Sequence, residues 1–247
     1  MNRIETIGDA TLYLGDCREI IPTLTDIAAV VTDPPYFLPA IHYQTRKEFP
    51  RSLTDLGILE HYFAGFFAEA SKALTDEGVA YVFCDGQSYP AFYATAYRQF
   101  KKLRPLVWDK VTAFNGYSWR HQHELILFLE KSEARAVPTG DGDIIRCAAV
   151  KVDDRDHPAE KPPGLIELLV RKSVEAGGIV CDPFMGSAAT GVACAKSARR
   201  FIGIEREPVY FDLACRRIEE VLRTDLFAKA QAEQLSMLPE PIPQAAE

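Results

Sequence analysis

The tetrapeptide Asp33-Pro34-Pro35-Tyr36 carries the most telling chemical groups of the chain. It directly follows residues 27–32, an apolar run typical of a buried strand. The Asp33 carboxylate and the Pro34 carbonyl are two hydrogen-bond acceptors, and the consecutive prolines restrict the backbone between them. Tyr36 adds an aromatic face beside these acceptors. A proline pair alone would indicate an ordinary turn, but the four residues together favour a site for a planar group with an exocyclic amine.

A second motif lies at residues 178–191, which read as a short strand, a loop of small residues and the start of a helix. The next strand, residues 200–205, ends on the acid Glu205. The two strands and the helix between them make a βαβ unit of the kind that binds nucleotide-like ligands. Small residues let the backbone approach a ligand closely, and Glu205 can accept hydrogen bonds from ribose hydroxyls.

In this order, the two motifs resemble those of the β-class amino-group DNA methyltransferases, which methylate exocyclic amines of adenine or cytosine. The resemblance covers nearly the whole chain, because residues 14–17, 123–128 and 157–162 also look like family segments. It implies S-adenosylmethionine as the cofactor. By resemblance, the residues that bind this cofactor are Asp16 and Cys17 at its adenine, Glu205 at its ribose, and Lys161, Asp182, Phe184, Gly186 and Ser187 at its amino-acid end.

The resemblance implies direct methyl transfer to the N6 amine of an adenine that has left the double helix. Asp33 and the Pro34 carbonyl would accept the two amine hydrogens, Tyr36 would stack on the base, and no metal would take part. Asp33 leans toward adenine, while the N4 amine of cytosine is the alternative. Asp33 and the motif order argue against the related enzymes that act on protein glutamine. A catalytically silent partner subunit is a further alternative, because Ala188 replaces a family glycine and its methyl would crowd a loop that needs positive φ.

Composition adds limits to this interpretation. The net charge of −7 does not indicate a nonspecific polyanion binder. Between Arg98 and His123, however, the sequence has six cations and a single acid, with Trp108, Phe114, Tyr117 and Trp119 interleaved. The six cysteines form no CxxC pair, so a zinc site is not predicted, and none follows a proline as the nucleophile of cytosine-ring methyltransferases would. The candidate DNA contacts are Arg46, Lys47, Arg51, Tyr117, Arg120 and His121.

The alternation of strand and helix patterns predicts an α/β fold, a single Rossmann-like domain over residues 1–225 with helices on both faces of its sheet. The resemblance implies seven strands and a circular permutation, with a catalytic half at 1–130, a short recognition loop at 131–156 and a cofactor half at 157–225. Residues 226–247 are expected to be a disordered tail after a helix ending near 223. The chain lacks a signal peptide or membrane-span pattern, which predicts a cytoplasmic protein of prokaryotic or phage origin. So small a domain offers limited DNA contact, which favours a homodimer acting on double-stranded DNA within a restriction-modification system.

Overall fold

The computed structural model describes residues 3–35, 56–113, 118–133, 140–150 and 161–236, with the side chains of 56, 58 and 225–236 left aside. The strands are β1 (Arg3–Ile7), β2 (Ala10–Leu14), β3 (Ile27–Thr32), β4 (Leu74–Cys84), β5 (Lys102–Asp109), β6 (His123–Glu130), β7 (Ile144–Arg146), β8 (Ile179–Asp182) and β9 (Arg200–Glu205). The helices are α1 (Cys17–Ile20), the 3₁₀ turn η1 (Ile21–Thr23), α3 (Leu56–Ala73), α4 (Tyr89–Ala96), α5 (Pro163–Ser173), α6 (Ala189–Lys196) and α7 (Pro208–Ser236).

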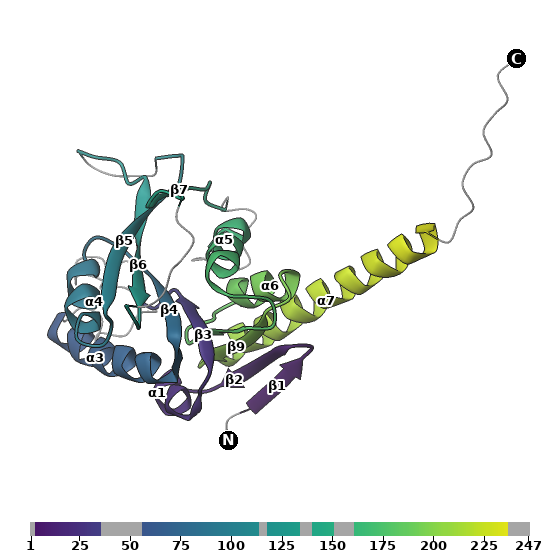
Figure 1. Ribbon diagram of the computed structural model, residues 1–247, viewed down its shortest axis with the longest axis horizontal. Coiled ribbons are helices and arrows are strands. Elements are labelled where there is room, and N and C mark those ends of the chain that lie inside the picture. The colour runs from purple at the N-terminus through teal and green to yellow at the C-terminus, as the bar shows by residue number, and fades with distance from the viewer. Residues whose placement is uncertain (1–2, 36–55, 114–117, 134–139, 151–160, 237–247) are drawn as a thin grey trace, which may run out of the picture.

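The described strands form one sheet in the order β1-β2-β9-β8-β3-β4-β6-β5-β7 (Figure 1). The run from β2 to β4 is parallel, and β6 is antiparallel to both β4 and β5. Two cores flank the sheet. One lies beneath α5, α6 and α7, and the other lies beneath α1, α3 and α4, as Figure 1 shows for the two groups of helices. The predicted α/β sheet with helices on both faces is therefore confirmed.

The expectation of seven strands is wrong, because the described residues already form a sheet of nine strands. The seven predicted strands are its central ones, and the additional strands β1 and β7 lie at its two edges. Strand β1 forms a hairpin with β2, and the connecting turn passes through Gly8 at φ +57°. Most of its side chains are exposed, so β1 lacks the apolar pattern that predicts a strand. Strand β7 is only three residues long and pairs with the end of β5.

The prediction for the C-terminal end also needs correction. Helix α7 does not end near 223 but continues to Ser236, so the first part of the expected tail is helical. The segment 224–236 contains neither glycine nor proline, and it has three alanines, two glutamines and two leucines, which favour helix. In Figure 1 this end of α7 projects away from the sheet. No described helix is both long and apolar enough to cross a bilayer.

Candidate active site

Four acids stand at the same edge of the sheet. Strands β2, β9, β8 and β3 are parallel neighbours, so their carboxyl ends lie side by side. Asp16 and Asp33 follow β2 and β3, while Asp182 and Glu205 are the last residues of β8 and β9. Ligands of open parallel sheets bind at this edge. Both motifs therefore lie at one edge of the sheet.

The first motif begins where β3 leaves the core. Thr32 is buried, Pro34 is buried and the Asp33 side chain is 22% exposed. The Asp33 carboxylate accepts a hydrogen bond from the ammonium of Lys161, a residue 128 positions away that lies just before α5. Lys161 is 7% exposed, so it is a buried lysine although it lies directly before the start of a helix. Tyr36 lies outside the described residues.

Asp182 is held by three hydrogen bonds in the core. One of its oxygens accepts from the Thr32 hydroxyl at 2.6 Å and from the Phe184 N–H at 3.2 Å. The other oxygen accepts from the Thr190 hydroxyl at 2.8 Å. Burial outweighs these bonds and raises the pKa of Asp182 to about 6. A cation placed beside Asp182 would therefore stabilise the ionised form of this carboxylate.

The loop between β8 and α6 is tied to Glu205. The Gly186 N–H donates to one oxygen of the Glu205 carboxylate at 3.0 Å, and the Glu207 N–H donates to the other at 2.8 Å. Burial raises the pKa of Glu205, although these backbone donors oppose the rise. From α7, Arg217 donates to the Ser187 hydroxyl at 2.7 Å and to the Ser187 carbonyl at 3.1 Å. The loop is therefore fixed from both ends.

Ala188 adopts the left-handed conformation, with φ 60° and ψ 43°, and forms the N-cap of α6. The expectation that a methyl at this position would meet a positive φ is confirmed. The loop closes nevertheless, because the Ala188 N–H bonds the Met185 carbonyl at 2.7 Å and the Ala188 carbonyl accepts from Val192 at 2.9 Å. The methyl is fully buried in the core below α6. Alanine thus carries the backbone strain that a glycine would avoid.

A cavity of about 90 Å³ joins the two motifs. Asp33 and Lys161 line it together with the loop after β8, which contributes Phe184, Met185, Gly186 and Ser187. The remaining lining residues come from the ends of neighbouring strands and from α5 and α6. They are Thr32, Phe83, Ile166, Asp182, Ala189 and Thr190. Asp33, predicted for catalysis, therefore lines the same cavity as Lys161, Asp182, Phe184, Gly186 and Ser187, which are predicted for cofactor binding.

Asp16 and Cys17 lie beside this region but do not line the cavity. The Asp16 side chain caps α1 and binds the Arg18 guanidinium, whose hydrogen bonds to the carboxylate hold the pKa of Asp16 below its usual range. The buried thiol of Cys17 lies 3.5 Å from the Tyr62 hydroxyl. The centre of the Tyr62 ring lies 6.5 Å from that of Phe184, so the two aromatic rings pack together beside the loop after β8.

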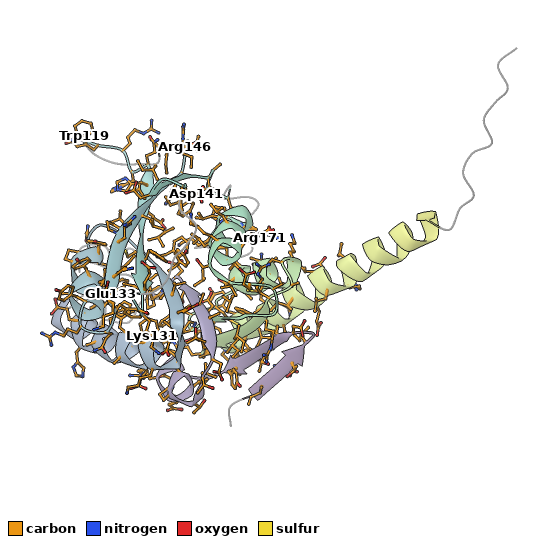
Figure 2. The ribbon with its side chains drawn as sticks, viewed as in Figure 1. Trp119, Lys131, Glu133, Asp141, Arg146 and Arg171 are labelled. Carbon is orange, nitrogen blue, oxygen red and sulfur yellow. The ribbon has the colours of Figure 1, made fainter. Side chains whose placement is uncertain are left out.

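The candidate DNA contacts fall into two groups. Arg120 and His121 are exposed between β5 and β6, next to Trp119, which is 90% exposed. Arg120 also donates to the Ala113 carbonyl at 2.7 Å. Figure 2 shows Trp119 and Arg146 at the same end of the β5–β6 pair. The others, Arg46, Lys47, Arg51 and Tyr117, lie outside the described residues.

The basic residues between Arg98 and His123 do not lie on one surface. Because β5 runs parallel to β4, Lys101 and Lys102 lie at the amino edge of the sheet, opposite Asp33. Figure 2 places Lys131 and Glu133 at that end, far from Trp119. Trp108 belongs to the core, where it is 2% exposed and donates to the Cys147 carbonyl at 2.7 Å. Strand direction therefore divides a sequence cluster between two edges.

Sequence reasoning missed several residues that the structure places around the cavity. Glu124, at the beginning of β6, lies 3.4 Å from the Lys161 ammonium, and Lys110 binds the other Glu124 oxygen at 2.5 Å. The residues that fix Asp182 and the loop, Thr32, Thr190 and Arg217, were also missed. Of these, only Thr32 has a visible signal in the sequence, as a polar residue at the end of an apolar strand. Among the described residues, no group of three or more His, Cys, Asp or Glu side chains is placed to hold a metal ion.

Comparison with known proteins places the chain among enzymes that modify DNA. The family model of the N6/N4 DNA methylases matches residues 27–216. A type II methyltransferase of Moraxella bovis, M2.MboI, is 26% identical over 242 residues, which cover 85% of this chain and 88% of the relative.

Two solved structures share the fold. The PvuII DNA methyltransferase, described as cytosine-N4-specific, superposes with a TM-score of 0.70 at 18% identity, covering 91% of this chain and 93% of that one. The M1.HpyAVI–SAM complex has a TM-score of 0.63 at 23% identity, covering 85% and 99%. Since the family model spans well over half of its residues, this chain belongs to the N6/N4 family of DNA methylases.

Proposed function

We propose that the protein transfers a methyl group from S-adenosylmethionine to the N6 amine of adenine in double-stranded DNA. One observation carries the proposal: Asp33, at the end of β3, and Gly186, in the loop after β8, line the same cavity. An acceptor for an amine therefore faces a loop suited to a cofactor. The family match and the SAM complex of M1.HpyAVI support the choice of cofactor.

The residues present fit such a cofactor. Two largely buried carboxylates, Asp182 and Glu205, flank Gly186, whose φ of +49° brings the loop backbone close to the strand ends. An ammonium group beside Asp182 would relieve the cost of ionising that acid in the core. Glu205 would accept hydrogen bonds from ribose hydroxyls. When bound, S-adenosylmethionine supplies a methyl group activated by an adjacent sulfonium.

Asp33 would carry the chemical step. Its carboxylate and the Pro34 carbonyl would accept the two hydrogens of the amine, which weakens the delocalisation of the nitrogen lone pair into the ring. The same acceptors would stabilise the positive charge that develops on nitrogen during attack. Holding amine and methyl group in line supplies much of the remaining rate, up to about 7–11 kcal/mol in well-oriented systems. Tyr36 would stack on the flipped base.

The test is incubation with S-adenosylmethionine and unmethylated double-stranded DNA, followed by nucleoside mass spectrometry. We expect N6-methyladenine. N4-methylcytosine would keep the mechanism but overturn the choice of base, an outcome to which the similarity with the PvuII enzyme gives weight. Binding of the cofactor without any methylated product would overturn the proposed reaction.

Asp33→Ala separates catalysis from binding. We expect the rate to fall at least about a hundredfold, while cofactor affinity measured by calorimetry stays close to that of the wild type. The matched control is Asp76→Ala, which removes an exposed acid near the start of β4, at the opposite edge of the sheet. Methylation at a normal rate by the Asp33 variant would refute the role of this carboxylate.

A further inference from the structure

The side chains of four residues form one ion-pair network that extends from the end of β3 to the end of β5. They are Asp33, Lys161, Glu124 and Lys110. Lys161 binds Asp33 and lies 3.4 Å from one oxygen of Glu124. Lys110 lies 2.5 Å from the other Glu124 oxygen. Acids and lysines alternate in this network, so each lysine lies against the carboxylate of Glu124. The four residues come from four separate segments, after β3, after β5, at the start of β6 and before α5.

The four side chains of this ion-pair network are largely shielded from water. Side-chain exposure is 9% for Lys161, 17% for Lys110, 19% for Glu124 and 22% for Asp33. The Lys161 ammonium also lies 5.2 Å from the centre of the Phe83 ring. Charges in such a place persist only when they are paired. Glu124 is therefore a second counter-ion that holds the Lys161 ammonium beside Asp33.

We propose that Glu124 is a positioning residue for methyl transfer, which keeps Lys161 charged and in place next to Asp33. This inference rests on the proposed function. The Glu124 charge also offsets that of Lys161, so Asp33 keeps its negative potential toward an amine that becomes positive in the transition state.

The titration of these groups follows from their surroundings. Burial opposes the charge of Lys161, but Asp33 and Glu124 together raise its pKa. Burial likewise opposes the charge of Glu124, and Lys161 and Lys110 lower its pKa. Two further groups face this region among the described residues. Cys84 of β4 stays neutral because burial raises its pKa to about 12, and Asp182 of β8 is close enough to sense the Asp33 charge.

Glu124→Gln tests the proposal, because it removes the charge and keeps the shape. We expect kcat to fall by about tenfold to a hundredfold, while KM for S-adenosylmethionine and its calorimetric affinity stay within about twofold. With one counter-ion lost, Lys161 gives up its proton more easily, so the alkaline limb of the pH–rate profile moves to lower pH. Glu130→Gln is the matched control at the other end of β6 and should leave kcat and the profile unchanged.

The outcomes separate the two proposals. A wild-type kcat in the Glu124→Gln variant would overturn this inference alone. A reduced kcat with an unchanged alkaline limb would also overturn it, because damage to packing lowers activity without changing the titration of Lys161. If Glu124→Gln fails to bind the cofactor, Glu124→Asp decides: it should retain the wild-type alkaline limb, and a shifted limb would overturn the inference. Absence of methylation by the wild-type protein would refute the proposed function and this inference with it.

Discussion

Replacement of Asp182 by asparagine should change how the stability of the protein depends on pH. In the folded protein the pKa of Asp182 is raised to about 6, from an ordinary value of 3.8. Between these two values the folded state retains a proton that the unfolded chain has released. The wild-type protein therefore loses stability as pH rises from about 4 to about 6. Asparagine cannot ionise, so this loss should be absent from the variant.

The magnitude follows from the difference between the two pKa values. About two pH units correspond to about 3 kcal/mol in full, of which about 2 kcal/mol falls between pH 4.5 and pH 7.5. The asparagine fits the same place. Its oxygen keeps the Thr32 and Phe184 donors, its amide donates to the Thr190 hydroxyl, and that hydroxyl can turn toward the Val31 carbonyl at 3.4 Å.

The assay is urea denaturation of both proteins, without cofactor, at several pH values in this range. The quantity of interest is the free energy of unfolding of the variant minus that of the wild type. All other titrating groups, including Glu205, are common to both proteins and cancel in this difference. We expect the difference to grow by about 2 kcal/mol from pH 4.5 to pH 7.5. A constant difference, or one that shrinks with pH, would refute the reasoning, because the ionised Asp182 would then be at no disadvantage in the core.

Three further substitutions test the loop and its supports. Gly203→Ala places a Cβ 2.2 Å from the Met185 sulfur and 2.7 Å from the Phe201 ring. It should therefore lower the free energy of unfolding, measured by urea denaturation, by about 1–3 kcal/mol and weaken cofactor binding in calorimetry. Wild-type values for both would contradict this description of the packing. Its control, Gly65→Ala in α3, meets nothing within 4 Å and should stabilise by about 0.5–1 kcal/mol; a loss would mean that the position is not open helix. Ala188→Gly should change the free energy of unfolding by less than about 1 kcal/mol, since relief of the left-handed strain is offset by lost burial of the methyl and by a more flexible unfolded chain; a loss well above this would show that alanine is unstrained there.

The sequence was sufficient for the parts of the fold that depend on local pattern. The seven central strands are apolar runs bounded by breakers, and they alternate with helical patterns, so their type and approximate bounds follow from the chain itself. The edge strands did not show in this way. Strand β1 owes its existence to pairing with β2 rather than to its own pattern, and β7 to pairing with β5. Pairing at an edge is a tertiary contact, which a local pattern does not record.

The same division applies to the site. Both motifs were recognisable because each is contiguous, and parallel strands with right-handed crossovers bring their carboxyl ends to one edge. The partners of the motif residues were not recognisable. Lys161 reaches Asp33 across 128 residues, and Glu124 reaches Lys161 because antiparallel β6 begins at the edge where parallel β3 and β4 end. The chain thus determines which groups are available for chemistry, while the direction and order of the strands decide which charges meet.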